Sequence, residues 1–517
     1  MNIFRNTLRT VALCLMTIAL TGCDLLYTES QEKLSGSEFW DGANSSDVRS
    51  FVNSIYSSLR KATMQDAAFF LLAGDMRCAP IDTKLDKTRN DGKYVVALST
   101  NDLNLLRQTY TDDGDYRSAK WIMDWQEMYE VVQSANILIK EVDRASISDA
   151  EKQAFRDEGI FARCLAYFLL VRNFGAVPYY TNAYNAAPLP RTDMVTVLKN
   201  ISAELQQVLD SDPDGNILPM TRTGSDKGVK ASRGAVLALM MHVNMWLAGF
   251  DEANAQAYYQ KVVDCGAELV DNNGGSYSLV PITQMTSSLF KGASNEGIFE
   301  IVQNISYASG SETFSINSVF SNQVMYTPIS GKKQANFFYP YDFMSKVYPS
   351  GQNDDRVTYW FNEYAYSTMD TYDSYREITK FKNVDSWGDN TTTNSGNYIV
   401  FRLGDAILLY AEALADLGTD DTKALELLNR IRQRANAPLM QVSGQDLKDA
   451  IYWERVRELI GEGQYFYDLV RTKRIFDSNF CWHTITKADF NNGAWTWPID
   501  REALTNNTNI ELNNFWE

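Results

Sequence analysis

YIVFRLGDAILLYAEALADLG (residues 398–418) and the TDDTKALELLNRIRQRA that follows it (419–435) decide the fold. Apolar residues recur every three or four positions in both stretches, which is the spacing of one buried helix face. The two stripes are Leu403, Ile407, Tyr410, Leu414 and Leu417, then Leu425, Leu428, Ile431 and Ala435. Gly418 can end the first helix, and Thr419 or Asp420 can cap the second. The pattern predicts an αα-hairpin, the repeating unit of tetratricopeptide-like solenoids.

The next stretch, ERVRELIGEGQYFYDLVRTKR (454–474), is dense in charge. Glu454, Glu458 and Glu462 are spaced by four residues, with Arg455 and Arg457 between them. One interpretation is catalytic, with paired carboxylates serving as acid and base. The other is a helix end joined to its neighbours by Arg–carboxylate pairs. We favour the structural interpretation because such charge networks are common structural devices.

Together these stretches resemble the C-terminal signature of the SusD/RagB family. The matching patterns are R-L-G-D-A-x-L-L-Y-A-E-A-L and E-R-x-R-E-L-x-x-E-G-x-x-x-x-D-L-x-R. A third, A-x-x-x-A-Y-F-L-L-x-R-x-F-G-x-V-P, lies at residues 162–178. The resemblance implies a mainly α protein, in which tetratricopeptide-like helical hairpins form a right-handed superhelix and an irregular, loop-rich subdomain carries short strands.

The first 22 residues have the form of a secretory signal. Arg5 and Arg9 precede a short apolar run that ends at Leu20-Thr21-Gly22-Cys23, which fits a lipobox. We expect Cys23 to become the first residue of the mature chain and to carry the lipid (diacylglyceryl and palmitate), which holds the protein on a membrane without a spanning helix. Residues 23–35 read as a tether. Asp24 leaves open whether the anchor lies in the inner or the outer membrane.

Composition narrows the class of function. The formal net charge is −17, so the chain is a poor partner for nucleic acid. The cysteines beyond Cys23 form no CxxC pair, and the chain has only two His, so no zinc site and no cofactor are expected. His242 lies in an apolar helix and reads as a buried, hydrogen-bonded side chain.

The stretch DSDPDGN resembles the start of a calcium loop. Asp210, Asp212 and Asp214 match its first ligand positions, but Thr221 stands where the loop needs a bidentate Glu. We interpret it as a turn and keep a structural calcium ion as the alternative.

Apolar periodicity predicts further helices before the hairpin and an irregular region between them. The helices are expected at residues 46–59, 121–139, 158–174, 192–210, 230–249 and 254–270. We divide the mature chain beyond the tether into an N-terminal helical region (36–270), a loop-rich region (271–397) and a C-terminal helical region (398–517). GIFEIVQNIS, at residues 297–306, reads as a short strand.

The ligand face is expected in residues 271–397, joined by an irregular insertion at about 65–115. Loops rich in aromatic and amide side chains suit neutral hydroxylated ligands. The candidate contact residues are Asp75, Arg77, Tyr94, Tyr326, Trp360, Tyr364 and Trp387. Gly74, Asp75 and Arg77 also match a step of the resembling family. Their alternative role is a buried Asp–Arg pair that orders the loop.

The resemblance implies a non-enzymatic surface lipoprotein. It would lie on the outer membrane and face the extracellular side. There it would capture oligosaccharide and pass it to a TonB-dependent importer barrel. A peptide-binding or scaffolding solenoid of the same family is the main alternative. A helical glycoside hydrolase is a further one, and it would need two carboxylates facing each other across an aromatic cleft.

Overall fold

A computed structural model gives the structure of the chain. It describes residues 36–64, 69–83, 86–88, 90–103, 120–302, 337–363, 376–378, 380–381, 384–387, 391–394 and 396–517. The expected signal, Cys23 and the tether lie outside these residues and stay predictions.

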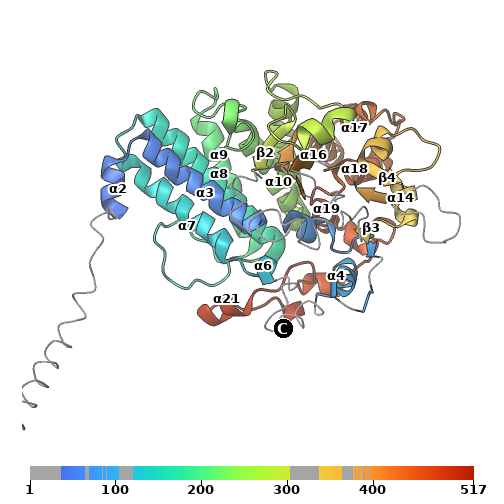
Figure 1. Ribbon diagram of the computed structural model, residues 1–517, viewed down its shortest axis with the longest axis horizontal. Helices are drawn as coiled ribbons and strands as arrows, with labels where there is room; N and C mark the ends of the chain where they lie inside the picture. The colour runs from blue at the N-terminus through green and yellow to red at the C-terminus, as the bar shows by residue number, and fades with distance from the viewer. Residues whose placement is uncertain are drawn as a thin grey trace, which may run out of the picture.

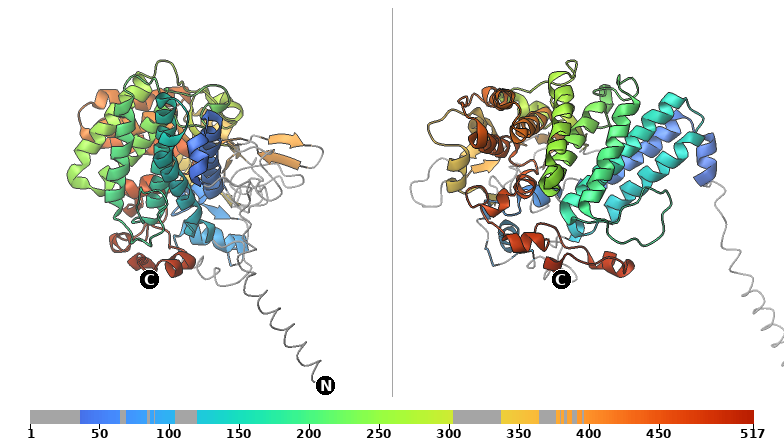
Figure 2. Two further views of the ribbon diagram at one scale, coloured as in Figure 1. Left: turned by 90° about the vertical axis from the view of Figure 1, so that its left-hand side faces the viewer. Right: turned by 180° about the vertical axis from the view of Figure 1, so that it is seen from behind.

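The body is a row of packed α-helices, as expected. The longer ones are α3 (Ser45–Met64), α4 (Asn90–Ser99), α7 (Gln126–Glu141), α8 (Asp149–Phe174), α9 (Met194–Ser211), α10 (Arg233–Phe250), α11 (Ala255–Gly266), α16 (Leu403–Leu417), α17 (Asp421–Arg434) and α18 (Gly444–Leu459). Apart from α4, each packs on its neighbour along the chain, and α11 packs on α16, so the N-terminal and C-terminal hairpins share one core (Figures 1 and 2).

Several helix ends follow the signals in the sequence. Gly418 ends α16 in the left-handed conformation (φ 67°), and the Asp420 side chain accepts the Lys423 N–H at the start of α17. Gly175 (φ 72°) ends α8. At the other end of α8, Ser148 and Glu151 form a capping box.

Two expectations for the N-terminal region were wrong. The predicted helix at 121–139 is divided into α6 (Lys120–Met123) and α7, because the Asp124 carboxylate accepts the Gln126 N–H and replaces a helical hydrogen bond there. The insertion at 65–115 is not irregular throughout. Residues 90–99 form α4, and Leu71–Asp75 form a single π-helical turn, η1.

Short antiparallel ribbons lie between the helices. The pairs are β1 (Asp82–Thr83) with β3 (Phe337–Phe338), β2 (Gly297–Ile301) with β8 (Tyr398–Arg402), β4 (Phe361–Glu363) with β5 (Arg376–Ile378), and β6 (Val384–Trp387) with β7 (Thr391–Asn394). The smaller helices are α2 (Gly36–Gly42), α12 (Ile282–Gln284), α14 (Tyr341–Val347), α15 (Asp355–Trp360), α19 (Tyr465–Arg471), α20 (Lys487–Asn491) and α21 (Arg501–Asn506). The expected strand near residue 297 is therefore β2.

The carboxylates of α18 form a buried ion-pair network, which confirms the structural interpretation. The side chains of Glu454 and Glu458 are 0 % exposed, and Glu462 follows just after the helix. Arg402, at the end of β8, reaches both Glu462 (Nε–Oε2 2.7 Å) and Glu458 (Nη1–Oε1 2.8 Å), and its Nη1 also lies 2.8 Å from Oε1 of Glu296. One guanidinium thus joins the β2–β8 ribbon to α18.

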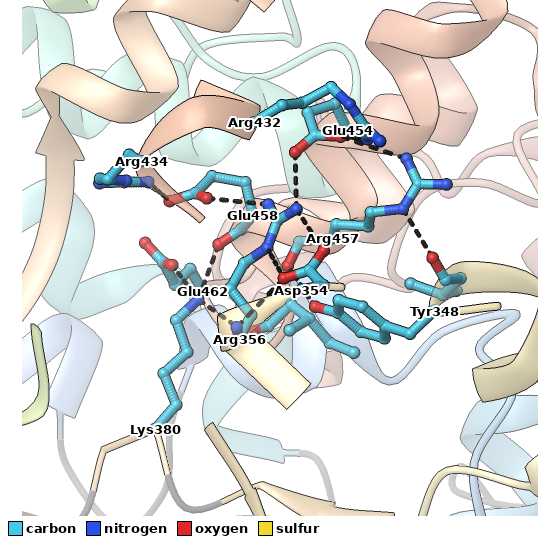
Figure 3. A network of polar contacts seen from close by, with 12 residues as sticks. Tyr348, Asp354, Arg356, Lys380, Arg432, Arg434, Glu454, Arg457, Glu458 and Glu462 are labelled. Carbon is cyan, nitrogen blue, oxygen red and sulfur yellow. Dashed lines mark hydrogen bonds and ion pairs between the residues drawn. The ribbon is translucent and has the colours of Figure 1, made fainter. Parts of the chain in front are cut away.

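The same carboxylates hold two segments of the loop-rich region (Figure 3). Arg356 on α15 pairs with Asp354 (2.7 Å), Glu454 (2.8 Å) and Glu458 (3.1 Å). The Lys380 ammonium pairs with Glu462 and donates to the Glu458 carbonyl at 2.8 Å. Burial alone would raise the pKa of Glu458, but the surrounding Arg charges outweigh it and hold that pKa well below its usual value.

A second buried cluster forms around Arg455 of α18. Arg455 pairs with Asp468 and Asp405, each at 2.8 Å. Asp405 also lies 2.7 Å from Nε2 of His242, so this histidine is a buried, hydrogen-bonded side chain as expected.

A backbone contact joins η1 to the turn before α19. A Cβ on Gly74 would lie 2.0 Å from the Gly463 carbonyl oxygen, so only glycine fits. The adjacent Asp75 carboxylate accepts the N–H groups of Gly463 (2.6 Å) and Tyr465 (3.3 Å). We call this contact of residues 74–75 with 463–465 the clasp. It fixes the N-terminal insertion to the C-terminal region.

Within the described residues, no single helix is both long and apolar enough to cross a bilayer. Arg233–Phe250 and Glu252–Asp271 reach that apolar length only together, across a bend of 119°.

We expect Glu458→Ala to lower the free energy of unfolding by about 3–5 kcal/mol at pH 7, because it leaves the buried Arg356 and Arg402 short of an anion. The control is Glu426→Ala, whose side chain is 68 % exposed in its pair with Lys423 and should contribute less than about 0.5 kcal/mol. Urea unfolding measures both variants. Equal losses would contradict a structural role for the network.

Gly74→Ala should destabilise the protein by about 2 kcal/mol or more, since the new methyl group meets a backbone oxygen that cannot rotate away. Gly42→Ala is the matched control, because a Cβ there meets no atom within 4 Å. Thermal melting compares the two variants. A Gly74→Ala protein as stable as Gly42→Ala would refute the clasp.

Burial raises the pKa of Asp75 to about 7, from 3.8, despite its two backbone hydrogen bonds. Between these values the unfolded chain releases a proton that the folded chain keeps, so stability should fall as pH rises from about 4 to about 7 and then level off. The full loss is on the order of 4 kcal/mol. Asp75→Asn should remove this component from unfolding curves measured at each pH, and an unchanged slope would count against it.

Candidate ligand-binding face

The β1–β3 ladder brings together the two segments expected to carry the ligand face. Asp82 pairs with Phe338 and Thr83 with Phe337, which joins the N-terminal insertion to the loop-rich region. The helix α4 packs on β1, and β3 lies beside β5 (Figure 1). We use the name ligand face for the surface around β1, β3, α4 and α14.

Four of the expected contact residues cannot be located as side chains. Tyr326 and Tyr364 lie outside the described residues. Tyr94 falls in α4 and Trp387 in β6, for which the backbone is described but these side chains are not. All four stay predictions.

Arg77 is an interior residue, which corrects its expected contact with ligand. Its guanidinium is 0 % exposed and donates to Asn101 Oδ1 (2.6 Å) and to the carbonyls of Trp495 (2.7 Å) and Ala494 (2.9 Å). Burial lowers its pKa to about 10. The ring of Phe466 lies 4.3 Å from the guanidinium carbon. Arg77 therefore anchors the C-terminal tail.

Asp75 is also interior, at 1 % exposure, and it serves the clasp. The alternative expectation, a direct Asp75–Arg77 pair, was wrong as well, because each side chain binds backbone groups of the C-terminal region instead. The burial and the ordering role were anticipated correctly, whereas the partners were not.

Trp360 is a core residue and offers no ring face to a ligand. It is 0 % exposed, and the Lys380 ammonium lies 4.1 Å from its ring centroid. The residue type alone did not reveal that this ring lies in the core, because aromatic rings serve cores and binding faces equally well.

Two exposed aromatic residues that are not among the candidate contact residues lie beside the ladder. Tyr341 is 46 % exposed and opens α14, three residues after β3. Trp482 is 41 % exposed, and its ring meets that of Phe343 on α14 edge to face at 6.2 Å. Exposed rings of this kind can stack on the apolar faces of sugars. In the sequence, Tyr341 lies within FFYPYDFM (337–344) and Trp482 within NFCWH (479–483). Other aromatic residues surround both, so the sequence does not separate exposed from buried rings.

The DSDPDGN stretch is built as a turn. The Asp212 carboxylate accepts the backbone N–H groups of Asn216, Ile217 and Leu218 at 2.7–2.9 Å, and Asp210 accepts from Gln206. In the described part of the chain, no group of three or more His, Cys, Asp or Glu side chains is placed to hold a metal ion. The Asp212 carboxylate therefore accepts hydrogen bonds from the backbone of its own turn.

Two family descriptions match the chain. The sequence model of the SusD family matches residues 314–516, and the model described as starch-binding associating with outer membrane matches residues 44–243. SusD-like protein P38 of Formosa agariphila is 24 % identical over 551 residues, covering 99 % of both chains.

Solved structures share the fold. The crystal structure of a SusD homolog from Bacteroides thetaiotaomicron is 48 % identical with a TM-score of 0.85, and it covers 93 % of this chain and 100 % of that one. A laminarin-binding SusD-like protein is 21 % identical with a TM-score of 0.67, covering 91 % and 99 %. These matches span both helical regions and the loop-rich region between them. The chain belongs to the SusD/RagB family.

Proposed function

We propose that the protein is an outer-membrane lipoprotein that binds oligosaccharide on its ligand face and passes it to a TonB-dependent importer without cleaving it. The observation that carries the proposal is the pair of exposed rings, Tyr341 and Trp482, beside the ladder that joins the two ligand-bearing segments. Aromatic rings supply apolar area for a sugar face at little cost in conformational entropy.

The family supports a sugar as the ligand. One matching family description names starch binding in association with the outer membrane, and one structural relative is described as binding laminarin. Both starch and laminarin are neutral glucose polymers, and the exposed rings of Tyr341 and Trp482 suit the apolar face of such a sugar.

Anchoring and delivery rest on the sequence. The lipobox at Leu20–Cys23 supports a lipid anchor, and family membership supports the importer as partner. A non-catalytic role agrees with the positions of Glu454 and Glu458, which are buried among arginines.

A panel of maltohexaose, laminarihexaose, cellohexaose and xylohexaose tests the proposal by isothermal titration. We expect at least one sugar to bind, and Trp482→Ala or Tyr341→Ala to weaken that binding about tenfold, or about 1.4 kcal/mol. Leu439→Ala, which removes an apolar side chain 57 % exposed elsewhere on the surface, should leave it unchanged.

Chromatography of the same sugars after incubation should show no shortened products. Binding to peptides but to none of the sugars would overturn the proposal, and so would cleavage of any sugar.

A further inference from the structure

A groove of about 360 Å³ lies between α7, the loop at residues 178–189 and the C-terminal segment that contains α21. In Figures 1 and 2, α21 lies at the opposite end of the lower edge from α4 and β3, so the groove is separate from the ligand face. The cavity is within the size range of small-molecule sites.

The groove is held open by hydrogen bonds between distant parts of the chain. Asn507 donates to the Leu189 carbonyl at 2.8 Å, and Asn509 donates to the Pro188 carbonyl at 3.0 Å. The Tyr129 hydroxyl donates to the Pro178 carbonyl at 2.7 Å. These bonds fix both walls before any ligand arrives, which lowers the entropic cost of binding.

The floor is aromatic. The rings of Tyr129 and Tyr180 are nearly parallel (9°) with centroids 6.1 Å apart, and Trp125 meets Tyr129 edge to face at 5.7 Å. Both tyrosines are only partly buried. Among the described residues the Tyr180 hydroxyl has no hydrogen-bond partner, whereas its backbone N–H is bound to Tyr167.

The rim is polar. The polar lining residues are Asp124, Gln126, Asn185, Glu502, Asn506 and Asn507, and no Lys or Arg is among the described residues that line the groove. Amide groups can both donate to and accept from hydroxyl groups. The two carboxylates disfavour an anionic ligand.

We propose that this groove is a second binding site for neutral sugar, of a size for one or two rings, independent of the ligand face. The rings of Tyr129 and Tyr180 provide apolar area for a pyranose face, while Gln126, Asn506 and the Tyr180 hydroxyl bond its hydroxyl groups. Two separated sites on one chain would hold a long glycan at two points and raise its apparent affinity through effective concentration.

Ala187→Trp tests the groove, because this exposed lining residue contributes only its backbone carbonyl to a hydrogen bond, from Asn185. Ala150→Trp, at an exposed position on α8, is the control. Both are made in the full chain on a Tyr341→Ala/Trp482→Ala background, so that the ligand face is already weakened. The probes are an array of neutral gluco-, manno- and xylo-oligosaccharides with trigalacturonic acid as the anionic comparison.

We expect the background protein to retain binding to a neutral glycan. Ala187→Trp should weaken this binding at least tenfold, whereas Ala150→Trp should leave it unchanged. Trigalacturonic acid should not bind. Loss of all binding in the background protein would overturn the groove as a sugar site but not the ligand face. Equal binding by the two tryptophan variants would also overturn the groove as a sugar site, and so would tight binding of trigalacturonic acid. Failure of the unmodified protein to bind any neutral glycan would overturn both sites.

Discussion

The pairing of buried arginines with the carboxylates of α18 is the constraint on which the rest of the structure depends. Arg402 from the β2–β8 ribbon and Arg356 from α15 meet at Glu458, which is fully buried. Removing such charges from water is costly, so the arrangement is stable only when every partner is in place. The ribbon, α15 and α18 must therefore assemble together, and the loop-rich region is held against the helical body at that point.

This attachment explains how irregular segments can carry a binding face. Long loops bind well when a rigid scaffold positions them. Here the network fixes the loop-rich region, the Gly74–Gly463 contact fixes the N-terminal insertion, and the short β1–β3 ladder joins the two. Tyr341 and Trp482 project from this supported edge. The helical row thus provides stability, while recognition is left to short exposed segments.

The sequence predicted the helical body well because helix signals are local. Gly418 ended its helix as expected, and Gly175 ends α8. The helix break at Asp124 was missed because a side chain replaced a backbone hydrogen bond. For the ion pairs, residue type and spacing predicted a network, but Glu296 and Arg402 lie too far from α18 in the sequence to be identified as partners.

The binding residues were harder to predict, because burial depends on tertiary packing. Trp360 and Trp482 look alike in sequence, yet one is 0 % and the other 41 % exposed. The central claim is that a rigid, ion-paired body presents sugar-binding rings at its edge. Hydrogen–deuterium exchange with and without the tightest-binding neutral glycan tests it most directly. The account predicts protection of the peptides that contain Tyr341 and Trp482, with α18 slow to exchange in both states. Rapid exchange throughout α18, or no glycan-dependent protection at those two peptides, would contradict it.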